Sequence, residues 1–490
     1  MSASRASAGQ AKDPDGITGR RGSLPLVGVL AAMAVSLTGT RVSAIALPWF
    51  VLVTTGSATR TGVVAFCEMA PYVLVKAFTG PLVDRAGPRT ISWTTDLISA
   101  AAALAIPLLH AADRLSFPLL LVLVALIGAA RGPGDLAKDV MVPEAADHGR
   151  VPLERATGFA GVTERLAFTV GPAAGGALIA FLGPLAGLAV NAACFALGSV
   201  IIGLALPRGM GRPAEQPSPS PSPQDTTGPP AEPGYWRRFG QGFTFLRSEP
   251  LLLTIVLMVM VTNFLDAAFS AVLLPVWAKE SGNGPSAIGL CAGAAGLAAI
   301  GGSLIAAGIA HRMRRRVVFF AGFLLAGAPR WLVLASPAPL WAVVIVFAAG
   351  GFGAGFLNPI LSAITYERVP RRLLGRVKAL SGALSWSGMP LGGLAAGAAV
   401  ASAGLAPVLL VGGAVYFLTT NLTGLRPEWR EMDRLRGKGR PADEPAVPRI
   451  TKPDGSPGRT GAPEPDPTSQ REPESGAGSG GGVRQTRSVR

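Results

Sequence analysis

The chain contains a series of apolar stretches, each about as long as the hydrocarbon core of a bilayer is thick. A helix needs about 20 predominantly apolar residues to cross that core. Only helices and closed barrels can do so, because hydrocarbon offers no hydrogen-bond partners and every backbone N–H and C=O must be paired within the protein. We therefore predict an all-α polytopic membrane protein with twelve transmembrane helices. The expected spans cover residues 24–53, 60–83, 90–110, 116–143, 154–181, 184–206, 251–278, 286–310, 317–335, 338–366, 376–402 and 405–425.

Positive charge gathers on one side of these expected spans. The chain carries 44 Lys and Arg against 29 Asp and Glu, and a formal net charge of +15 by itself would also fit nucleic-acid binding. The external loops, however, hold only Arg60, Arg114 and Lys279, whereas the other loops and the tails hold most of the remainder. Because positive charge in short loops stays in the cytoplasm, we expect both termini there. The predicted location is the cell (inner or plasma) membrane, with lipid and not nucleic acid as the charged partner.

Changes in composition divide the chain into five parts. Residues 1–23 and 426–490 are polar tails, which we expect to be disordered and cytoplasmic. Residues 24–206 and 251–425 form two six-helix halves, and residues 207–250 form a linker that begins with a Pro- and Ser-rich run. At the end of this linker an interfacial helix is predicted, because aromatic and aliphatic residues recur at helical spacing between arginines. These residues are Trp236, Phe239, Phe243 and Leu246.

The two halves carry similar signals in the same order. Val142-Pro143 and Gly149-Arg150-Val151 precede the fifth expected span, and Val369-Pro370 and Gly375-Arg376-Val377 precede the eleventh. Pro172 with Gly175-Gly176 follows in the fifth span, and Pro390 with Gly392-Gly393 follows in the eleventh. The fifth and eleventh spans correspond only if the second six helices repeat the first six in parallel, a plan known in transporters.

The sequence offers little to support an enzyme or a pump driven by ATP. It lacks a Gly-rich phosphate loop that ends in Gly-Lys-Ser/Thr, and it lacks the His-Glu-x-x-His and Gly-x-Ser-x-Gly motifs. His110, His148 and His311 lie at loops or at span ends, and the three cysteines match no metal-binding spacing. We expect no enzymatic activity, no cofactor and no metal site, and we expect the energy for any transport to come from a gradient.

The most specific motif is GPLVDRAGPRT, which runs from Gly80 to Thr90 between the second and third spans. It is similar to the cytoplasmic loop signature of the major facilitator superfamily, Gly-x-x-x-Asp-Arg-x-Gly-Arg-Arg. The resemblance implies that superfamily's fold of two six-helix halves and a cytoplasmic gate at this loop. There Asp84 would cap a neighbouring helix and the arginines would pair with acids across the interface between the halves. The matching residues are Gly80, Asp84, Arg85, Gly87 and Arg89, while Pro88 departs from the pattern.

The fifth span resembles the antiporter motif of the drug exporters in that superfamily. Glycine and proline in this span would permit a bend and close packing against the other half. The resemblance implies export rather than import. The residues that carry it are Gly158, Gly171, Pro172, Gly175 and Gly176, and Ala167 replaces one glycine of the pattern. Small residues are also common in membrane helices for packing alone, which is the alternative interpretation.

Charged residues within the spans are functional candidates, because a charge in hydrocarbon costs several kcal/mol unless it is paired or hydrated. Arg131 lies about midway along the fourth span, and Asp135 follows one helical turn later, so the two can pair. Arg131 also resembles the fourth-span arginine that the superfamily's drug exporters use in proton transfer. The candidates for proton coupling are Arg131, Asp135, Asp266, Glu68 and Glu164, with a static packing role as the alternative for each.

A second group of residues is expected to line the substrate cavity. Arg41 in the first span stands near the position where drug exporters often carry an acid, so an anionic or zwitterionic substrate is conceivable. Trp386 lies well inside its span, unlike tryptophans that anchor at the membrane interface. The candidates are Arg41, Trp386 and Asn358.

These features together favour a monomeric secondary transporter. We expect it to export small amphipathic molecules, such as a drug, an antibiotic or a metabolite, by alternating access coupled to inward proton flow. Two alternatives stay open on the sequence alone: an importer or facilitator on the same fold, and a membrane sensor or scaffold that transports nothing.

Overall fold

The computed structural model describes residues 22–207, 210, 243–309 and 315–425. Within these residues every regular element is helical, so the predicted all-α fold is confirmed. The tails and most of the linker, including Trp236 and Phe239 of the expected interfacial helix, lie outside the described residues. Residues 243–248 at its end are helical.

The first half consists of six long helices and one short one. They are α2 (Leu24–Thr55), α3 (Ala58–Phe78), α4 (Gly80–Ala86), α5 (Pro88–Ala111), α6 (Phe117–His148), α7 (Leu153–Leu182) and α8 (Pro184–Ala205). Helix α2 packs along α7 and α8, and α6 packs along α3 and α5. The second expected span therefore ends earlier than predicted, at Phe78, and the gate motif begins a separate short helix.

The second half contains more breaks within its helices. Its elements are α10 (Pro250–Ala268), a π-helical turn η1 (Phe269–Leu273), α11 (Leu274–Glu280), α12 (Gly284–Ile309), α13 (Arg315–Ala326), α14 (Ala328–Ala335), α15 (Leu340–Arg368), α16 (Arg371–Ser387), α17 (Met389–Ala403) and α18 (Leu405–Leu425). Pro390 cannot donate a backbone hydrogen bond, and the chain is broken at Gly388 just before it.

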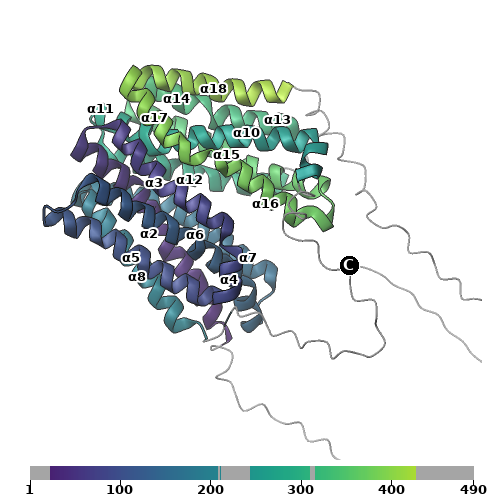
Figure 1. The fold of residues 1–490 in the computed structure, drawn as a ribbon. Coiled ribbons are helices and arrows are strands. Elements are labelled where there is room, and N and C mark those ends of the chain that lie inside the picture. The colour runs from purple at the N-terminus through teal and green to yellow at the C-terminus, as the bar shows by residue number, and fades with distance from the viewer. Residues whose placement is uncertain (1–21, 208–209, 211–242, 310–314, 426–490) are drawn as a thin grey trace, which may run out of the picture. The chain divides into compact units, whose positions relative to one another are not determined.

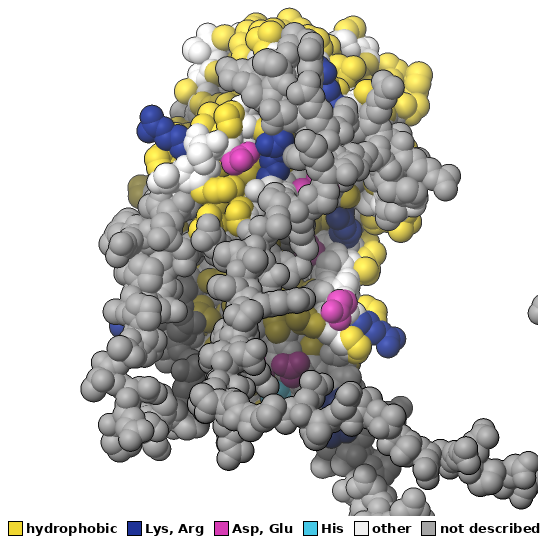
Figure 2. All heavy atoms as spheres, turned by 90° about the vertical axis from the view of Figure 1, so that its right-hand side faces the viewer, with side chains coloured by type: hydrophobic (Ala, Val, Ile, Leu, Met, Phe, Trp, Pro, Cys, Tyr) yellow, Lys and Arg dark blue, Asp and Glu magenta, His cyan; other side chains and the backbone are white. Residues whose placement is uncertain are grey.

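In the described part of the chain, eleven helices are long and apolar enough to cross a membrane. The eleventh expected span, residues 376–402, is missing from this set because the break at Gly388 divides it into α16 and α17. Large hydrophobic side chains are exposed on the outer surface, among them Phe78, Phe181 and Leu204. Figure 2 shows hydrophobic side chains (yellow) along the upper edge of one face. An apolar outer surface is what a bilayer requires.

The helices gather in two groups, α2 to α8 and α10 to α18 (Figure 1). The groups contact each other mainly where α3 packs against α17 and where α7 packs against α12. These contacts are close because glycines leave the backbones bare. A Cβ added to Gly62 would meet the carbonyl oxygen of Gly393, and one added to Gly176 would lie 2.6 Å from the Cα of Gly289.

Candidate functional site

Arg131 joins two helices of the first half through a cluster of charges. Its Nη1 atom donates to Oε1 of Glu68 on α3 over 2.9 Å, and its Nε atom lies 3.9 Å from Oδ2 of Asp135, one turn away on α6. The arginine side chain is 11% exposed and the two acids are 21% and 22% exposed. The predicted pairing of Arg131 with Asp135 is therefore present, but Glu68 is the closer partner. One buried cation is shared by two partly accessible carboxylates.

Aromatic side chains cover this cluster and connect it to the second half. The guanidinium carbon of Arg131 lies 4.4 Å from the centroid of the Tyr72 ring, and the Tyr72 hydroxyl donates to Oδ2 of Asp135 over 3.4 Å. Lys76 donates to the same hydroxyl over 3.1 Å. Across the interface, Trp386 on α16 stacks on Tyr72 with 6.3 Å between the ring centroids. A movement of either half would therefore change the contacts around the charge cluster.

Arg41 on α2 is a further cation near this cluster, and its contacts differ from those of Arg131. Its guanidinium carbon lies 3.3 Å from the centroid of the Phe168 ring on α7. Its Nε atom is buried and has no hydrogen-bond partner among the described residues. Glu164 lies one turn before Phe168 with an exposed side chain, and it forms no ion pair within the described part of the chain.

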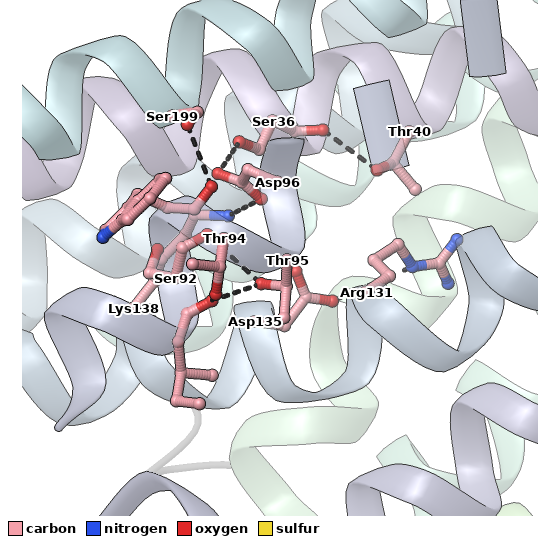
Figure 3. A network of polar contacts seen from close by, with 12 residues as sticks. Ser36, Thr40, Ser92, Thr94, Thr95, Asp96, Arg131, Asp135, Lys138 and Ser199 are labelled. Atoms are coloured by element: carbon pink, nitrogen blue, oxygen red, sulfur yellow. Dashed lines mark hydrogen bonds and ion pairs between the residues drawn. The ribbon is translucent and has the colours of Figure 1, made fainter. Parts of the chain in front are cut away.

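Lys138 and Asp96 form a second charged pair deeper in the first half (Figure 3). Lys138 Nζ lies 2.7 Å from Oδ1 of Asp96, and their side chains are only 3% and 4% exposed. The hydroxyl of Ser36 donates to the other carboxylate oxygen over 3.4 Å. The pair ties α5 to α6 with α2 close by, so its geometry is that of a structural tie within one half.

The second half has its own pair, Asp266 on α10 and Arg330 on α14, which are in ion-pair contact. The guanidinium carbon of Arg330 lies 5.0 Å from the ring centroid of Phe269 and 5.4 Å from that of Tyr416. Asp266 lies in the last turn of α10 before the π-helical turn, whose Ser270 hydroxyl donates to the Asp266 carbonyl over 2.8 Å. Such turns are frequent at functional sites.

A small cavity lies between the two halves beside Asp266. Its volume is about 150 Å³, and residues of α3, α10, η1 and α17 line it. Met69, the neighbour of Glu68, contributes from the first half, and Gly393 contributes from the second. Asp266 is 41% exposed, so its carboxylate remains accessible from this space.

The glycines of the antiporter-like motif on α7 allow two close helix contacts. A Cβ on Gly171 would lie 2.6 Å from the Cβ of Arg41, and one on Gly175 would lie 3.0 Å from the Cα of Val42, so both make room for α2. Gly176 faces Gly289 of the other half, and Pro172 contributes its carbonyl oxygen to the same contact. An added Cβ at Gly158 would have no atom of the described residues within 4 Å, so no close contact there depends on this glycine.

The gate motif is only partly described. Gly87 has a φ of 81°, a conformation that favours glycine, and it separates α4 from α5. Arg89 donates from Nη2 to the carbonyl oxygen of Gly203 over 2.7 Å and from Nε to that of Leu206 over 3.1 Å. It therefore caps the end of α8 in its own half. Among the described residues it does not pair with an acid across the interface, contrary to what was expected. Arg85 is exposed, and the side chains at 80 and 84 lie outside the described set.

The structure brings together some predicted residues and adds others that the sequence did not single out. Tyr72, Lys76 and Arg330 were missed, although Lys76 and Arg330 are cations inside apolar stretches and an expectation of charge balance would have found them. Trp386 is 40% exposed and stacks on Tyr72, and it is not among the residues that line the small cavity beside Asp266. The side chain of Asn358 lies outside the described set. Among the described residues no group of His, Cys, Asp and Glu could hold a metal ion.

Comparisons with known proteins agree with this architecture. The model of the Major Facilitator Superfamily matches residues 29–266 and 258–449. Multidrug efflux pump Tap of Mycobacterium tuberculosis (strain ATCC 25618 / H37Rv) is 30% identical over 409 residues, which cover 83% of this chain and 94% of that protein. Multidrug efflux pump Tap of Mycolicibacterium fortuitum is 28% identical over 421 residues, which cover 84% and 97%.

Solved structures show the same fold at low sequence identity. The crystal structure of nucleoside transporter NupG superposes with a TM-score of 0.64 at 12% identity, over 81% of this chain and 98% of that one. At this identity the likeness concerns the fold alone.

Proposed function

The chain belongs to the major facilitator superfamily, and from this premise we propose that it exports small amphipathic molecules across the cell membrane in exchange for protons. Relatives named as multidrug efflux pumps, at up to 30% identity over most of both chains, support drugs or antibiotics as the substrate class. Three antiporter-like glycines of α7 support the direction of transport: Gly171 and Gly175, which pack against α2, and Gly176, which packs against α12.

The observation that carries the proposal is the sharing of Arg131 between Glu68 and Asp135. A carboxylate that takes up a proton loses its attraction for the guanidinium, so the arginine then pairs with the other acid alone. Glu68 lies on α3, which contacts the second half, and Asp135 lies on α6. Protonation of one acid therefore changes the force between these two helices. This is a means of coupling proton uptake to a movement of the halves.

The contacts between the halves support alternating access as the mechanism. Gly62 and Gly176 lie toward the helix ends that the charge distribution assigns to the external side, and both meet backbone of the other half. Lys279 adds to this closure, since its Nζ donates to the carbonyl oxygen of Leu52 over 3.0 Å. Helices that meet through glycines can separate without disrupting interdigitated side chains. These contacts support a state closed to the outside, from which cytoplasmic substrate would be loaded.

Proton flow can supply the work that export requires. Each net charge that moves inward releases about 2.3 kcal/mol per 100 mV of membrane potential, apart from any contribution of the pH gradient. One proton per substrate at that potential is therefore equivalent to an accumulation ratio of roughly fiftyfold, since about 1.4 kcal/mol corresponds to tenfold.

The experiment is the accumulation of fluorescent dyes and antibiotics in cells that express the chain, with and without a protonophore. We expect accumulation to fall on expression and to recover with the protonophore. Asp135→Asn and Glu68→Gln should restore accumulation to the level of cells without the protein. The exposed Glu280→Gln variant, outside the cluster, is the matched control and should export normally.

Two results would contradict the proposal. Accumulation that rises with expression would indicate import on the same fold. If no compound responds to expression in correctly inserted protein, the chain would instead be a sensor or scaffold of the same superfamily.

A further inference from the structure

Arg41 lies in the middle of a membrane helix and forms no ion pair with an acid among the described residues. It lies about halfway along the 32 residues of α2, so it is near the centre of the bilayer. The other cations of the cavity region each contact an acid or a hydroxyl. Arg131 contacts Glu68, and Arg330 contacts Asp266. A cation at this depth is costly unless it is hydrated or meets an anion.

The side chain is held so that one end of the guanidinium stays free. Its carbon lies 3.3 Å from the centroid of the Phe168 ring, which fixes the plane of the group by a cation–π contact. Its Nε atom is buried without a partner. The two terminal nitrogens make no hydrogen bond to a described residue, and neither is among the fully buried polar atoms that lack a partner, so both keep some exposed surface on a half-buried side chain. Gly171 packs directly against the aliphatic stem of the arginine, because an added Cβ there would lie 2.6 Å from the Cβ of Arg41.

The accessible nitrogens belong to the same region as the proton-coupling cluster. The ionisable groups near enough to act on Arg41 electrostatically are Arg131, Asp135, Glu164 and Tyr72. None of the acids among them is in ion-pair contact with Arg41. The guanidinium of Arg41, unpaired among the described residues, is therefore near Arg131, whose two acids, Glu68 and Asp135, already pair with Arg131.

We propose that Arg41 binds a carboxylate of the transported molecule. This names the substrate class of the proposed exporter, amphipathic molecules that carry a carboxylate, and it therefore rests on the proposed function. A planar guanidinium with two free terminal nitrogens matches the two oxygens of a carboxylate, and the Phe168 ring holds it ready for that geometry. An anionic lipid headgroup offers similar chemistry at the membrane surface, whereas Arg41 lies near the bilayer centre.

The test is equilibrium binding of two dyes to the purified full-length protein in detergent, measured by fluorescence anisotropy. The dyes are a rhodamine with a free carboxylate and its methyl ester, which differ only in that group. Wild-type protein should bind the carboxylate form more tightly. Arg41→Gln should weaken binding of the carboxylate form by about tenfold or more and leave the ester unchanged. Arg41→Lys keeps the charge without the planar guanidinium, so its affinity for the carboxylate form should lie between those of wild type and Arg41→Gln.

Arg60→Gln is the matched control. Arg60 also lies over a phenylalanine, with its guanidinium carbon 5.3 Å from the centroid of Phe117, but it is exposed at the start of α3. It should bind both dyes as wild type does. Because Arg41 has no acid to leave unpaired, Arg41→Gln should also unfold at the wild-type temperature, so a loss of binding cannot be attributed to misfolding.

The inference is overturned if wild-type protein binds the carboxylate form no more tightly than the ester, or if Arg41→Gln weakens both dyes equally or neither. Binding is measured without a membrane or a gradient, so the result is separate from the proposed function. Proton-driven uptake of the same dyes into everted vesicles tests that function. If uptake is absent while binding discriminates as expected, the exporter proposal fails and the carboxylate site stands.

Discussion

Replacing Lys138 with methionine tests whether the buried pair of the first half is structural. The Lys138 ammonium is 2.7 Å from Asp96, and both side chains are at most 4% exposed. Without the lysine, Asp96 keeps only the long 3.4 Å hydrogen bond from Ser36 among its side-chain hydrogen bonds to described residues. Removing one partner of a buried pair costs about 3–5 kcal/mol, because an uncompensated charge is left in a medium of low dielectric. We expect this loss in the free energy of unfolding.

The assay is reversible unfolding of the purified protein in mixed micelles, with the double variant Asp96→Asn/Lys138→Met as the comparison. Replacing both charges removes the desolvation cost together with the attraction, so the double variant should be about as stable as wild type or more stable. It should also retain dye export. The reasoning is refuted if the single variant loses no stability, or if the double variant is as unstable as the single one. A stable double variant that has lost export would make the pair part of the coupling machinery.

Three further predictions concern the interface and the other polar contacts. Gly62→Ala places a Cβ against the carbonyl oxygen of Gly393, so spin labels on the external ends of α3 and α17 should move apart; an unchanged distance would contradict the closure. Arg330→Gln leaves Asp266 unpaired and should lower the free energy of unfolding by about 1–3 kcal/mol, with Arg330→Gln/Asp266→Asn recovering most of it. Arg89→Ala removes the cap of α8 and should cost about 1 kcal/mol without changing the protonophore response of dye export, whereas loss of that response would assign Arg89 to the gate.

Much of the fold could be predicted because a bilayer sets a length that the sequence must match. Each long apolar stretch is helical, although some are divided between two helices, and most outer bounds agree within a few residues. The breaks could not be read in the same way. Gly388 interrupts the eleventh span and Gly327 separates α13 from α14, yet glycine is also common within unbroken membrane helices. The choice depends on packing that only the tertiary structure supplies.

The candidate site was predictable where partners are close in sequence. Asp135 follows Arg131 by one turn, so the pair could be inferred from helical spacing. Glu68 is 63 positions from Arg131, and its role as the closer partner depends on how α3 packs against α6. Arg330 was missed for the same reason, because its partner Asp266 is 64 positions away on another helix. Spacing reveals partners on one helix and not partners between helices.

The central claim is that substrate export and proton movement are one process that passes through the Arg131 cluster. It is tested most directly by substrate-induced proton flux in proteoliposomes that contain the purified protein and hold an imposed pH gradient, acid inside. Adding a transported dye should dissipate the gradient in wild-type vesicles and leave it intact in Glu68→Gln vesicles. Dye uptake that proceeds at the wild-type rate with no change in the gradient would contradict the account.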